Sequence, residues 1–489
     1  MEDEGYLIKQ RKEKLKNFQE IGLNPYSYKF DKNAYAKNIL EDNRKLKNGE
    51  RTKKRVKIAG RIISSRLMGR SLFGDLQDST GKIQFYIKEN LVGKDRYKLF
   101  KKFDVGDIIG VEGLIFKTNK GETSVEAKKF DLLTKSLRPL PAKWHGLKDK
   151  EIRYRQRYLD LIMNPKIKDA FAIRILIIHH IREFLVKKGY VEVETPVLQP
   201  IYGGTNARPF KTFLNDLKIH TYLRISNELY LKRLIVGGYE KIFEFSKDFR
   251  NEGIDKTHNP EFILMETMWA YADYKDNMDL TEEMIEYVAK NIFGTTKLNY
   301  QGKIIDVKRP WKRLGMVQAI KKYVKIDITN MNDGEIKSFI DNHKIKLEGE
   351  FSRGMAIQLI FEEFVESKLI QPTIIYDFPH ETCVLAKQKR DNPFYGERFE
   401  PFINGWEFGN SYSEENRPEI LKREWEKEEK KLIRGDEEAQ RMDKDFIEAL
   451  EYGMPPTSGL GIGVDRLAIL FSDQESIRDI IMFPFMKPV

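Results

Sequence analysis

The segment Phe249-Arg-Asn-Glu-Gly-Ile-Asp-Lys-Thr-His-Asn-Pro-Glu-Phe262 joins two stretches in which apolar and polar residues alternate. These stretches, Ile242–Phe249 and Glu261–Thr267, are predicted to be antiparallel β-strands connected by a polar loop. Arg250, which leaves the first strand, can bind a phosphate or a carboxylate through two parallel hydrogen bonds. Glu252 points to the same side and can bind an amino group. By itself the segment is also compatible with an ordinary Arg–Glu pair across the strands.

A glycine run near the C-terminus, Gly459-Leu-Gly-Ile-Gly-Val-Asp-Arg466, supplies a second arginine. Alternating glycines let another group approach a strand backbone closely, and Arg466 can bind the far end of a triphosphate. The run is not a dinucleotide-binding fingerprint, because Val464 stands where the last glycine would be. Upstream, Phe184–Pro196 predicts a helix that passes through Gly189 into a strand. Taken separately, these two segments also fit simple core packing.

Length and composition narrow the classes of protein. The 489 residues suffice for two or three domains, and 40% of them are apolar, without a run of the ~20 apolar residues that a membrane span requires. The acidic start Met1–Glu4 does not predict a secretory signal. The single cysteine, Cys383, fits a reducing compartment, so a cytoplasmic protein is expected. The sequence contains no P-loop, no cysteine–histidine cluster with zinc spacing and no Gly-x-Ser-x-Gly elbow.

The N-terminal third predicts a basic helix followed by a small β-barrel. Residues 1–60 contain 16 Lys and Arg against nine Asp and Glu, which fits either a solvated surface or a polyanion partner. Residues 1 to about 50 are predicted to be helical, with an end near Gly22 and Pro25. Short alternating stretches from Val56 to Leu133, separated by turn residues, predict an antiparallel barrel of the kind that binds single-stranded nucleic acid.

Together these segments resemble motifs 1, 2 and 3 of class II aminoacyl-tRNA synthetases, and within that class the chain resembles lysyl-tRNA synthetases from about residue 50 to the C-terminus. The marks of this subgroup are Gly203–Phe210, Glu228–Arg233, Phe249–Phe262, Leu385–Lys387, Glu397–Glu400, Gly409–Glu414 and Ser476–Pro488.

The resemblance implies an α+β multidomain protein with four parts. These are a basic helical extension (1–50), an OB-type anticodon-binding barrel (51–135), a linker (136–165) and a class II catalytic domain with an antiparallel sheet flanked by helices (166–489).

The implied activity is that of a lysine–tRNA ligase, which joins L-lysine to ATP as lysyl-adenylate, releases pyrophosphate and transfers lysine to tRNA(Lys). The lysine carboxylate is its own nucleophile, so the chemistry calls for cations that position two anions rather than for a protein base. The resemblance implies that Arg250 and Arg466 are catalytic and that Mg²⁺ is held by Glu400 and Glu407. The implied ATP-binding residues are Arg250, Glu252, His258, Asn259, Phe262, Glu400, Glu407 and Arg466.

The implied lysine pocket contains carboxylates, since a buried cation requires a counter-charge. By resemblance, Glu228 and Glu266 lie towards the α-amino group and Glu414 binds the ε-ammonium. The implied lysine-binding residues are Gly204, Glu228, Glu266, Met268, Asn410, Tyr412 and Glu414. Outside this pocket, Cys383-Val384 replaces a usual Ser-Pro of the family, and two positions of the pocket itself depart from the family. Met268 replaces a tyrosine that helps to hold the lysine side chain, and Tyr412 stands where the family often has phenylalanine. Since methionine is a poor hydrogen-bonding partner, weaker or altered lysine recognition is expected, and Met268→Tyr is predicted to bind lysine more tightly.

The resemblance further implies that Arg66, Phe73 and Gln84 contact the anticodon bases, and that motif 1 forms a homodimer interface. Three alternatives stay open. An aspartate or asparagine enzyme shares the barrel and the motifs, but Glu414 favours a cationic substrate. A paralogue that attaches lysine to a protein is the second alternative, but such paralogues lack the barrel that residues 56–133 predict. A catalytically inactive RNA-binding or regulatory protein does not require the intact arginine and glutamate set.

Overall fold

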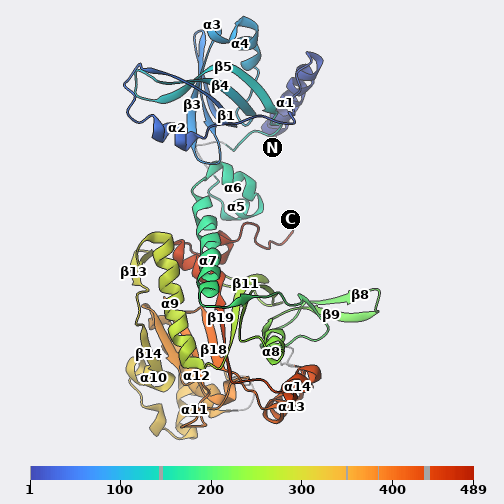
Figure 1. The fold of residues 1–489 in the computed structure, drawn as a ribbon, viewed down its shortest axis with the longest axis vertical. Helices are drawn as coiled ribbons and strands as arrows, with labels where there is room; N and C mark the ends of the chain where they lie inside the picture. The colour runs from blue at the N-terminus through green and yellow to red at the C-terminus, as the bar shows by residue number, and fades with distance from the viewer. Residues whose placement is uncertain (1, 142–146, 348–350, 384, 434–440, 489) are drawn as a thin grey trace. The chain divides into compact units, whose positions relative to one another are not determined.

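The computed structural model describes residues 2–141, 147–347, 351–383, 385–433 and 441–488, in two compact units, 1–148 and 149–489. Figure 1 shows the elements of each unit. Those of the first unit are α1 (Glu2–Glu20), α2 (Ala36–Asp42), β1 (Arg51–Met68), β2 (Ser71–Gln77), β3 (Lys82–Lys88), α3 (Glu89–Val92), α4 (Lys94–Phe100), β4 (Ile108–Lys117) and β5 (Thr123–Thr134).

The first unit contains the predicted barrel, closed in the order β1-β2-β3-β5-β4. Alternate residues of each strand point inward, and the interior is apolar, with Ile58, Phe85 and Val111 fully buried. All strand pairs of the barrel are antiparallel except β3–β5, which is parallel. The predicted end of the first helix near Gly22 and Pro25 is confirmed, and of the later residues to about 50 only those of α2 are helical. α1 ends at Glu20, ahead of Gly22 with its positive φ, and the chain then runs without regular structure to α2.

The second unit contains a large sheet in the order β14-β15-β16-β18-β19-β11-β10-β6, with β17 paired to β16. It is mainly antiparallel, as expected, but β6 and β14 each pair in parallel with their neighbours. Its strands are β6 (Val191–Glu192), β10 (Lys241–Phe249), β11 (Glu261–Ala270), β14 (Lys312–Gly315), β15 (Thr373–Tyr376), β16 (Arg398–Ile403), β17 (Trp406–Glu407), β18 (Gly409–Ser413) and β19 (Thr457–Gly463).

Helices and two small sheets accompany this large sheet. The helices are α5 (Lys150–Arg155), α6 (Arg157–Met163), α7 (Ile167–Lys187), α8 (Glu228–Val236), α9 (Tyr274–Phe293), α10 (Met316–Val324), α11 (Asp333–Asn342), α12 (Arg353–Phe364), α13 (Pro418–Ile433), α14 (Lys444–Glu451), α15 (Val464–Phe471) and α16 (Ile477–Ile480), with 3₁₀ turns at Ile328–Asn330, Glu366–Lys368 and His380–Thr382. The small sheets are formed by β7 (Leu198–Gln199), β8 (Lys211–Leu214) and β9 (Ile219–Leu223), and by β12 (Lys297–Tyr300) and β13 (Lys303–Asp306).

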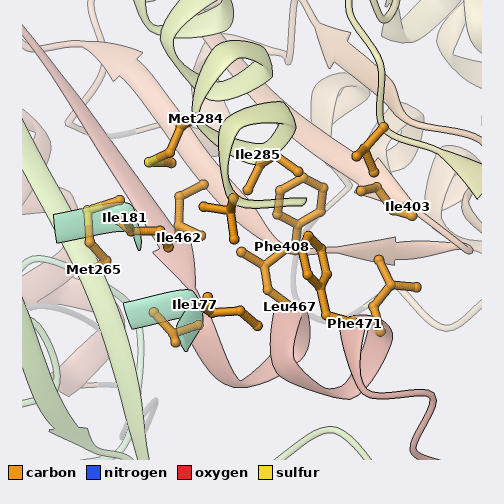
Figure 2. Close-up of a cluster of buried hydrophobic side chains, with 14 of the residues drawn as sticks. Ile177, Ile181, Met265, Met284, Ile285, Ile403, Phe408, Ile462, Leu467 and Phe471 are labelled. Carbon is orange, nitrogen blue, oxygen red and sulfur yellow. The ribbon is translucent and has the colours of Figure 1, made fainter. Parts of the chain in front are cut away.

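The core lies where helices pack on one face of the sheet. Figure 2 shows Ile181 of α7, Met284 and Ile285 of α9 and Leu467 of α15 gathered against Ile462 of β19. Helix α9 is well delimited, because Asp273 and Asp276 form a capping box at its start and Gly294 ends it in the left-handed conformation. This packing fixes β19 and its neighbours, which carry the site.

The segment expected as a linker, 136–165, contains the two short helices α5 and α6. Residues 142–146 lie outside the described residues, and α5 and α6 belong to the second unit. Arg157 is fully buried, paired with Asp160 at 2.7 Å, and donates hydrogen bonds to the backbone oxygens of Met482 and Arg478, each at 2.9 Å. These helices therefore anchor the C-terminal segment. Among the described helices, none has both the length and the apolar character that a membrane crossing needs.

Candidate active site

A cavity of about 350 Å³ opens in the second unit above β19 and its two neighbours, β11 and β18. The strand register explains which residues form the floor of this cavity. Gly461 pairs with Glu266 on one side and Asn410 on the other, and Gly459 pairs likewise with Met268 and Tyr412. Since the glycines have no side chains, the residues of the flanking strands meet above them. Every residue predicted for ATP or lysine lines this cavity: Gly204, Glu228, Arg250, Glu252, His258, Asn259, Phe262, Glu266, Met268, Glu400, Glu407, Asn410, Tyr412, Glu414 and Arg466.

Arg250 follows the last residue of β10 and is held over the ring of Phe262, with its guanidinium carbon 5.1 Å from the ring centroid. The predicted hairpin is confirmed, because β10 and β11 pair in register from Lys241 with Trp269 to Phe249 with Glu261. The buried Nε of Arg250 has no hydrogen-bond partner among the described residues. An arginine that lines a cavity and has an unused donor suits an anionic ligand.

Arg466 and His258 form the outer end of the cavity. Arg466 lies in the first turn of α15 and donates to the carboxylate of Glu407 at 2.8 Å, while its other amino nitrogen lies 3.2 Å from Nε2 of His258. His258 contacts Asp255 through Nδ1 at 2.8 Å. Glu252 is exposed at the mouth, and the amide of buried Asn259 donates to the backbone oxygen of Glu261 at 2.7 Å. Two arginines and a histidine thus surround the space that a polyphosphate would fill.

Carboxylates line the same cavity as these cations. Arg398 donates to Glu400 at 2.5 Å and to Asn410 at 3.0 Å, so it holds both side chains at the cavity wall. Burial raises the pKa of Glu400 to about 8 against the effect of Arg398, and the charges of Glu407 and Glu366 add to the rise. Burial and the charge of Glu407 also contribute to raising the pKa of Glu366 to about 7. The neighbouring carboxyl groups therefore raise the pKa of Glu400 and Glu366 even though arginines contact Glu400 and Glu407, and such a group of carboxylates suits a hard cation.

The inner part of the cavity is narrow and acidic. Gly204 has a φ of +92°, and a Cβ there would lie 2.9 Å from the hydroxyl oxygen of Ser226. Ser226 donates to Glu266 at 3.4 Å and accepts from the backbone N–H of Glu228 at 3.1 Å. Burial raises the pKa of Glu266 well above its ordinary value, and the charges of Asp248 and Glu228 add to the rise, against Arg250. An α-ammonium group would relieve this excess of negative charge.

The innermost wall contains a group that the sequence reasoning missed. Lys232, one turn after Glu228 in α8, is 1% exposed and pairs with both Glu228, at 2.5 Å, and Glu414. The hydroxyl of Tyr412 also donates to Glu228, at 2.7 Å. The site predicted for a substrate ammonium is thus already in contact with an internal one. Its sequence signal was the i,i+4 spacing of Glu228 and Lys232 in a helix-forming segment.

Further residues of the site were not predicted, among them Arg398, Ser226 and Asp248. Arg398 and Ser226 line the cavity, and Asp248 lies beneath it, fully buried, 3.2 Å from Nε of Arg224. Asp248 is detectable in the sequence only as a charged residue at an inward position of a predicted strand. Arg398 and Ser226 have no sequence signal of that kind, because each also contacts a residue of another element, Asn410 in one case and Glu266 in the other.

In the first unit, the residues predicted to contact the anticodon share one outer face of the barrel. Arg66 pairs with Phe73, and Phe73 pairs with Tyr86, whose ring centroid is 4.6 Å away. Gln84 lies two residues before Tyr86 in β3, therefore on the same face, and accepts a hydrogen bond from Ser124 at 2.8 Å. Stacked aromatic rings beside a cation and an amide suit single-stranded bases.

Comparison with known proteins identifies the family of this chain. Residues 149–487 match the family model of the class II tRNA synthetases (D, K and N), and residues 56–133 match that of the OB-fold nucleic acid binding domain. The lysine–tRNA ligase of Carboxydothermus hydrogenoformans is 49% identical over 484 residues, covering 99% of this chain and 98% of that protein. The lysine–tRNA ligases of Clostridium botulinum (strain Langeland) and Pelotomaculum thermopropionicum are each 49% identical, over 99% and 100% of this chain and 96% of either protein. The chain belongs to the class II lysyl-tRNA synthetases, with an N-terminal OB-fold domain of the anticodon-binding type.

Proposed function

We propose that this synthetase activates L-lysine with ATP in the cavity above β19 and then transfers the lysine to tRNA(Lys). The observation that carries the assignment is that residues of both charges line one cavity. Arg250 and Arg466 line it together with the carboxylates of Glu228, Glu266 and Glu414. This arrangement matches a ligand that is anionic where the reaction occurs and cationic at its amino groups.

In the proposed reaction, the lysine carboxylate attacks the α-phosphorus of ATP, and pyrophosphate leaves. Arg250 binds the lysine carboxylate and the α-phosphate together, which reduces their repulsion and aligns the attack. Phe262 stacks on one face of adenine and Arg466 covers the other. His258 and Arg466 bind the outer phosphates, and Glu252 and Asn259 bind adenine and the neighbouring phosphate. No side chain has to accept a proton during this step.

Mg²⁺ is part of the proposal. Glu400 and Glu407 would hold it, because both line the cavity, and a cation would offset the burial and the neighbouring charges that raise the pKa of Glu400. The ion would neutralise phosphate charge as pyrophosphate departs. Arg398 keeps Glu400 directed into the cavity through its 2.5 Å hydrogen bond.

Recognition of tRNA is assigned to the first unit. We propose that Arg66, Phe73 and Gln84 bind the anticodon, and that the basic extension 1–50 adds affinity for the phosphate backbone. The proposed division is an extension (1–50), an anticodon-binding barrel (51–135), a linker (136–165) and a catalytic domain (166–489). A cytoplasmic location accords with the single, buried Cys383.

A homodimer is also proposed. Helix α7 and the strands after it expose apolar side chains, among them Ile175, Val186, Val191 and Leu198, whose exposed fractions are 56%, 54%, 50% and 42%. We propose that they contribute to a protein interface, where such side chains would be covered. Sedimentation of the full chain tests the proposal, and a concentration-independent monomer would contradict it.

The activity is tested by amino-acid-dependent exchange between pyrophosphate and ATP with Mg²⁺, using each of the twenty amino acids. Exchange with lysine, followed by lysylation of tRNA(Lys), is the expected result. Exchange with aspartate or asparagine instead would mean that the pocket has been assigned to the wrong substrate. A folded protein without exchange would favour a regulatory RNA-binding role.

A further inference from the structure

Lys232 is a buried cation in the wall of the proposed lysine pocket. Its Nζ lies 2.5 Å from Oε1 of Glu228 and pairs also with Glu414. Both carboxylates line the cavity, whereas Lys232 is not among the described residues that do so. The ammonium therefore contacts the carboxylates from behind, and their opposite sides face the space for the substrate.

The charges at this end of the pocket are unequal. Glu228 and Glu414 carry two negative charges if both are ionised, and Lys232 carries one positive charge. Burial by itself would lower the pKa of Lys232, but Glu228 and Glu414 outweigh burial and raise it, so the ammonium stays charged. The hydroxyl of Tyr412 satisfies Glu228 further without adding charge. Burial raises the pKa of Glu414 to about 8 even against the effect of Lys232, so one more positive charge is needed to keep both groups ionised, and a single substrate ammonium supplies it.

We propose that Lys232 is a positioning and specificity-determining residue for lysine, which holds Glu228 and Glu414 together as carboxylates and leaves them one positive charge short. This role rests on the proposed lysine pocket. It also sets the depth of the pocket, because neither carboxylate is free to move away from the substrate while Lys232 binds both. Gly459 contributes, since a Cβ there would lie 2.3 Å from Oε1 of Glu414.

The competing explanation is an ion pair that only stabilises α8. A helix-stabilising Glu–Lys pair needs no second carboxylate, and its charges lie in solvent. Lys232 instead joins α8 to the residue that follows β18, at the inner end of the cavity. The groups facing this pair from all sides are Glu228 and Lys232 of α8, Glu266 of β11, Tyr412 of β18 and Glu414.

Lys232→Met tests the proposal through lysine-dependent exchange between pyrophosphate and ATP. Without the ammonium, two neighbouring buried carboxylates retain a shared proton at neutral pH, and a bound substrate ammonium must expel it. We expect the KM for lysine to rise about tenfold or more at pH 7 and to fall as the pH is raised to 8.5. The KM for ATP should not change, kcat should change less than the KM for lysine, and the wild type should show a flatter pH profile.

The control is Arg233→Met, the neighbouring residue of α8. Arg233 also forms ion pairs, with Asp443 and Asp445, but it does not line the cavity. It should keep the wild-type KM for lysine. A Lys232→Met enzyme with wild-type KM and pH profile would overturn the role of Lys232. If Glu414→Gln also left the KM for lysine unchanged, the proposed pocket itself would be wrong.

Circular dichroism and thermal unfolding establish whether Lys232→Met folds. If it does not, Lys232→Arg decides the question, because it retains the charge with a longer and bulkier group. The guanidinium would push both carboxylates into the cavity and shorten it. The ratio of kcat/KM for ornithine, which is one methylene shorter, to that for lysine should then increase. An unchanged ratio in a folded Lys232→Arg enzyme would contradict the proposal.

Discussion

Met268 and Tyr412 lie opposite each other across Gly459, to which each is paired, one from β11 and the other from β18. Met268 is 2% exposed, and Tyr412 packs against the cluster that contains it. The resemblance implies that the pocket departs from the family pattern at these two positions. Tyr412 carries a phenol hydroxyl, which the side chain at 268 lacks, and it donates to Glu228 at 2.7 Å.

This exchange of positions predicts how lysine affinity responds to substitution. Tyr412→Phe should raise the KM for lysine about tenfold, because Glu228 loses a buried donor. Met268→Tyr by itself should bring no gain, contrary to the expectation from sequence, since a second ring over Gly459 overpacks the core. The double variant should recover most of the loss of Tyr412→Phe. If the KM for lysine of the double variant were no lower than that of Tyr412→Phe, a tyrosine at 268 could not replace the one at 412.

Arg250 is predicted to act mainly on the chemical step. Arg250→Gln should lower kcat for adenylate formation about 10²–10³-fold, because one charged donor to the reacting groups is lost. The melting temperature should stay within a few degrees of the wild type, since the buried Nε of Arg250 has no partner among the described residues. Rapid-quench measurement of adenylate formation tests this, and near-normal kcat with only a raised KM for ATP would argue against it.

Glu407 is predicted to set the requirement for Mg²⁺. Glu407→Gln removes a carboxylate that lines the cavity and accepts from Arg466 at 2.8 Å. We expect the Mg²⁺ concentration for half-maximal exchange to rise about tenfold, while the KM for lysine stays the same. Titration of exchange with Mg²⁺ gives the answer. An unchanged requirement would exclude Glu407 as a ligand.

Asp248 is predicted to make stability dependent on pH. Burial raises its pKa from 3.8 to about 6, against the effects of Arg224 and Arg250. The native state therefore holds this proton more tightly than the unfolded state, so the free energy of unfolding falls as the pH rises from about 4 to 6. The loss is on the order of 3 kcal/mol. This pH-dependent loss should be absent in Asp248→Asn. The free energy of unfolding of this variant relative to wild type should therefore increase as the pH rises from about 4 to 6.

Urea unfolding at pH 4.5 and 7.5 measures this difference. Asp216→Asn is the matched control, because Asp216 is exposed at the β8–β9 connection and should give the same difference at both pH values. If the relative stability of Asp248→Asn were independent of pH, Asp248 would be ionised in the native state throughout the range.

The outer face of the barrel is predicted to affect tRNA alone. Phe73→Ala should raise the KM for tRNA(Lys) in lysylation about tenfold or more, since stacking contributes ~1–3 kcal/mol per base. Exchange without tRNA should remain at the wild-type rate, because Phe73 lies in the first unit and the cavity in the second. Tyr28→Ala, which replaces a fully exposed aromatic residue elsewhere in that unit, is the comparison. Equal effects of the two variants would speak against a specific role for Phe73.

The sequence by itself determined the features that depend on neighbouring residues. Alternation predicted β10 and β11, the segment Phe184–Pro196 predicted the passage from a helix through Gly189 into a strand, and the glycine run predicted a close approach to β19. Such patterns reflect local backbone preferences and the separation of buried from exposed positions, which a short segment contains in full. The resemblance added the residues of the site, and all fifteen predicted for ATP and lysine line one cavity.

Only the tertiary structure decided which of these groups are already paired. Lys232 meets Glu414 because α8 packs beside the strands, and Met268 meets Tyr412 because both strands pair with Gly459. Strand register and helix packing depend on the whole core, and a shift of one residue would turn each side chain to the other face. The charge balance of the pocket is therefore a property of the fold, although every charge in it is written in the sequence.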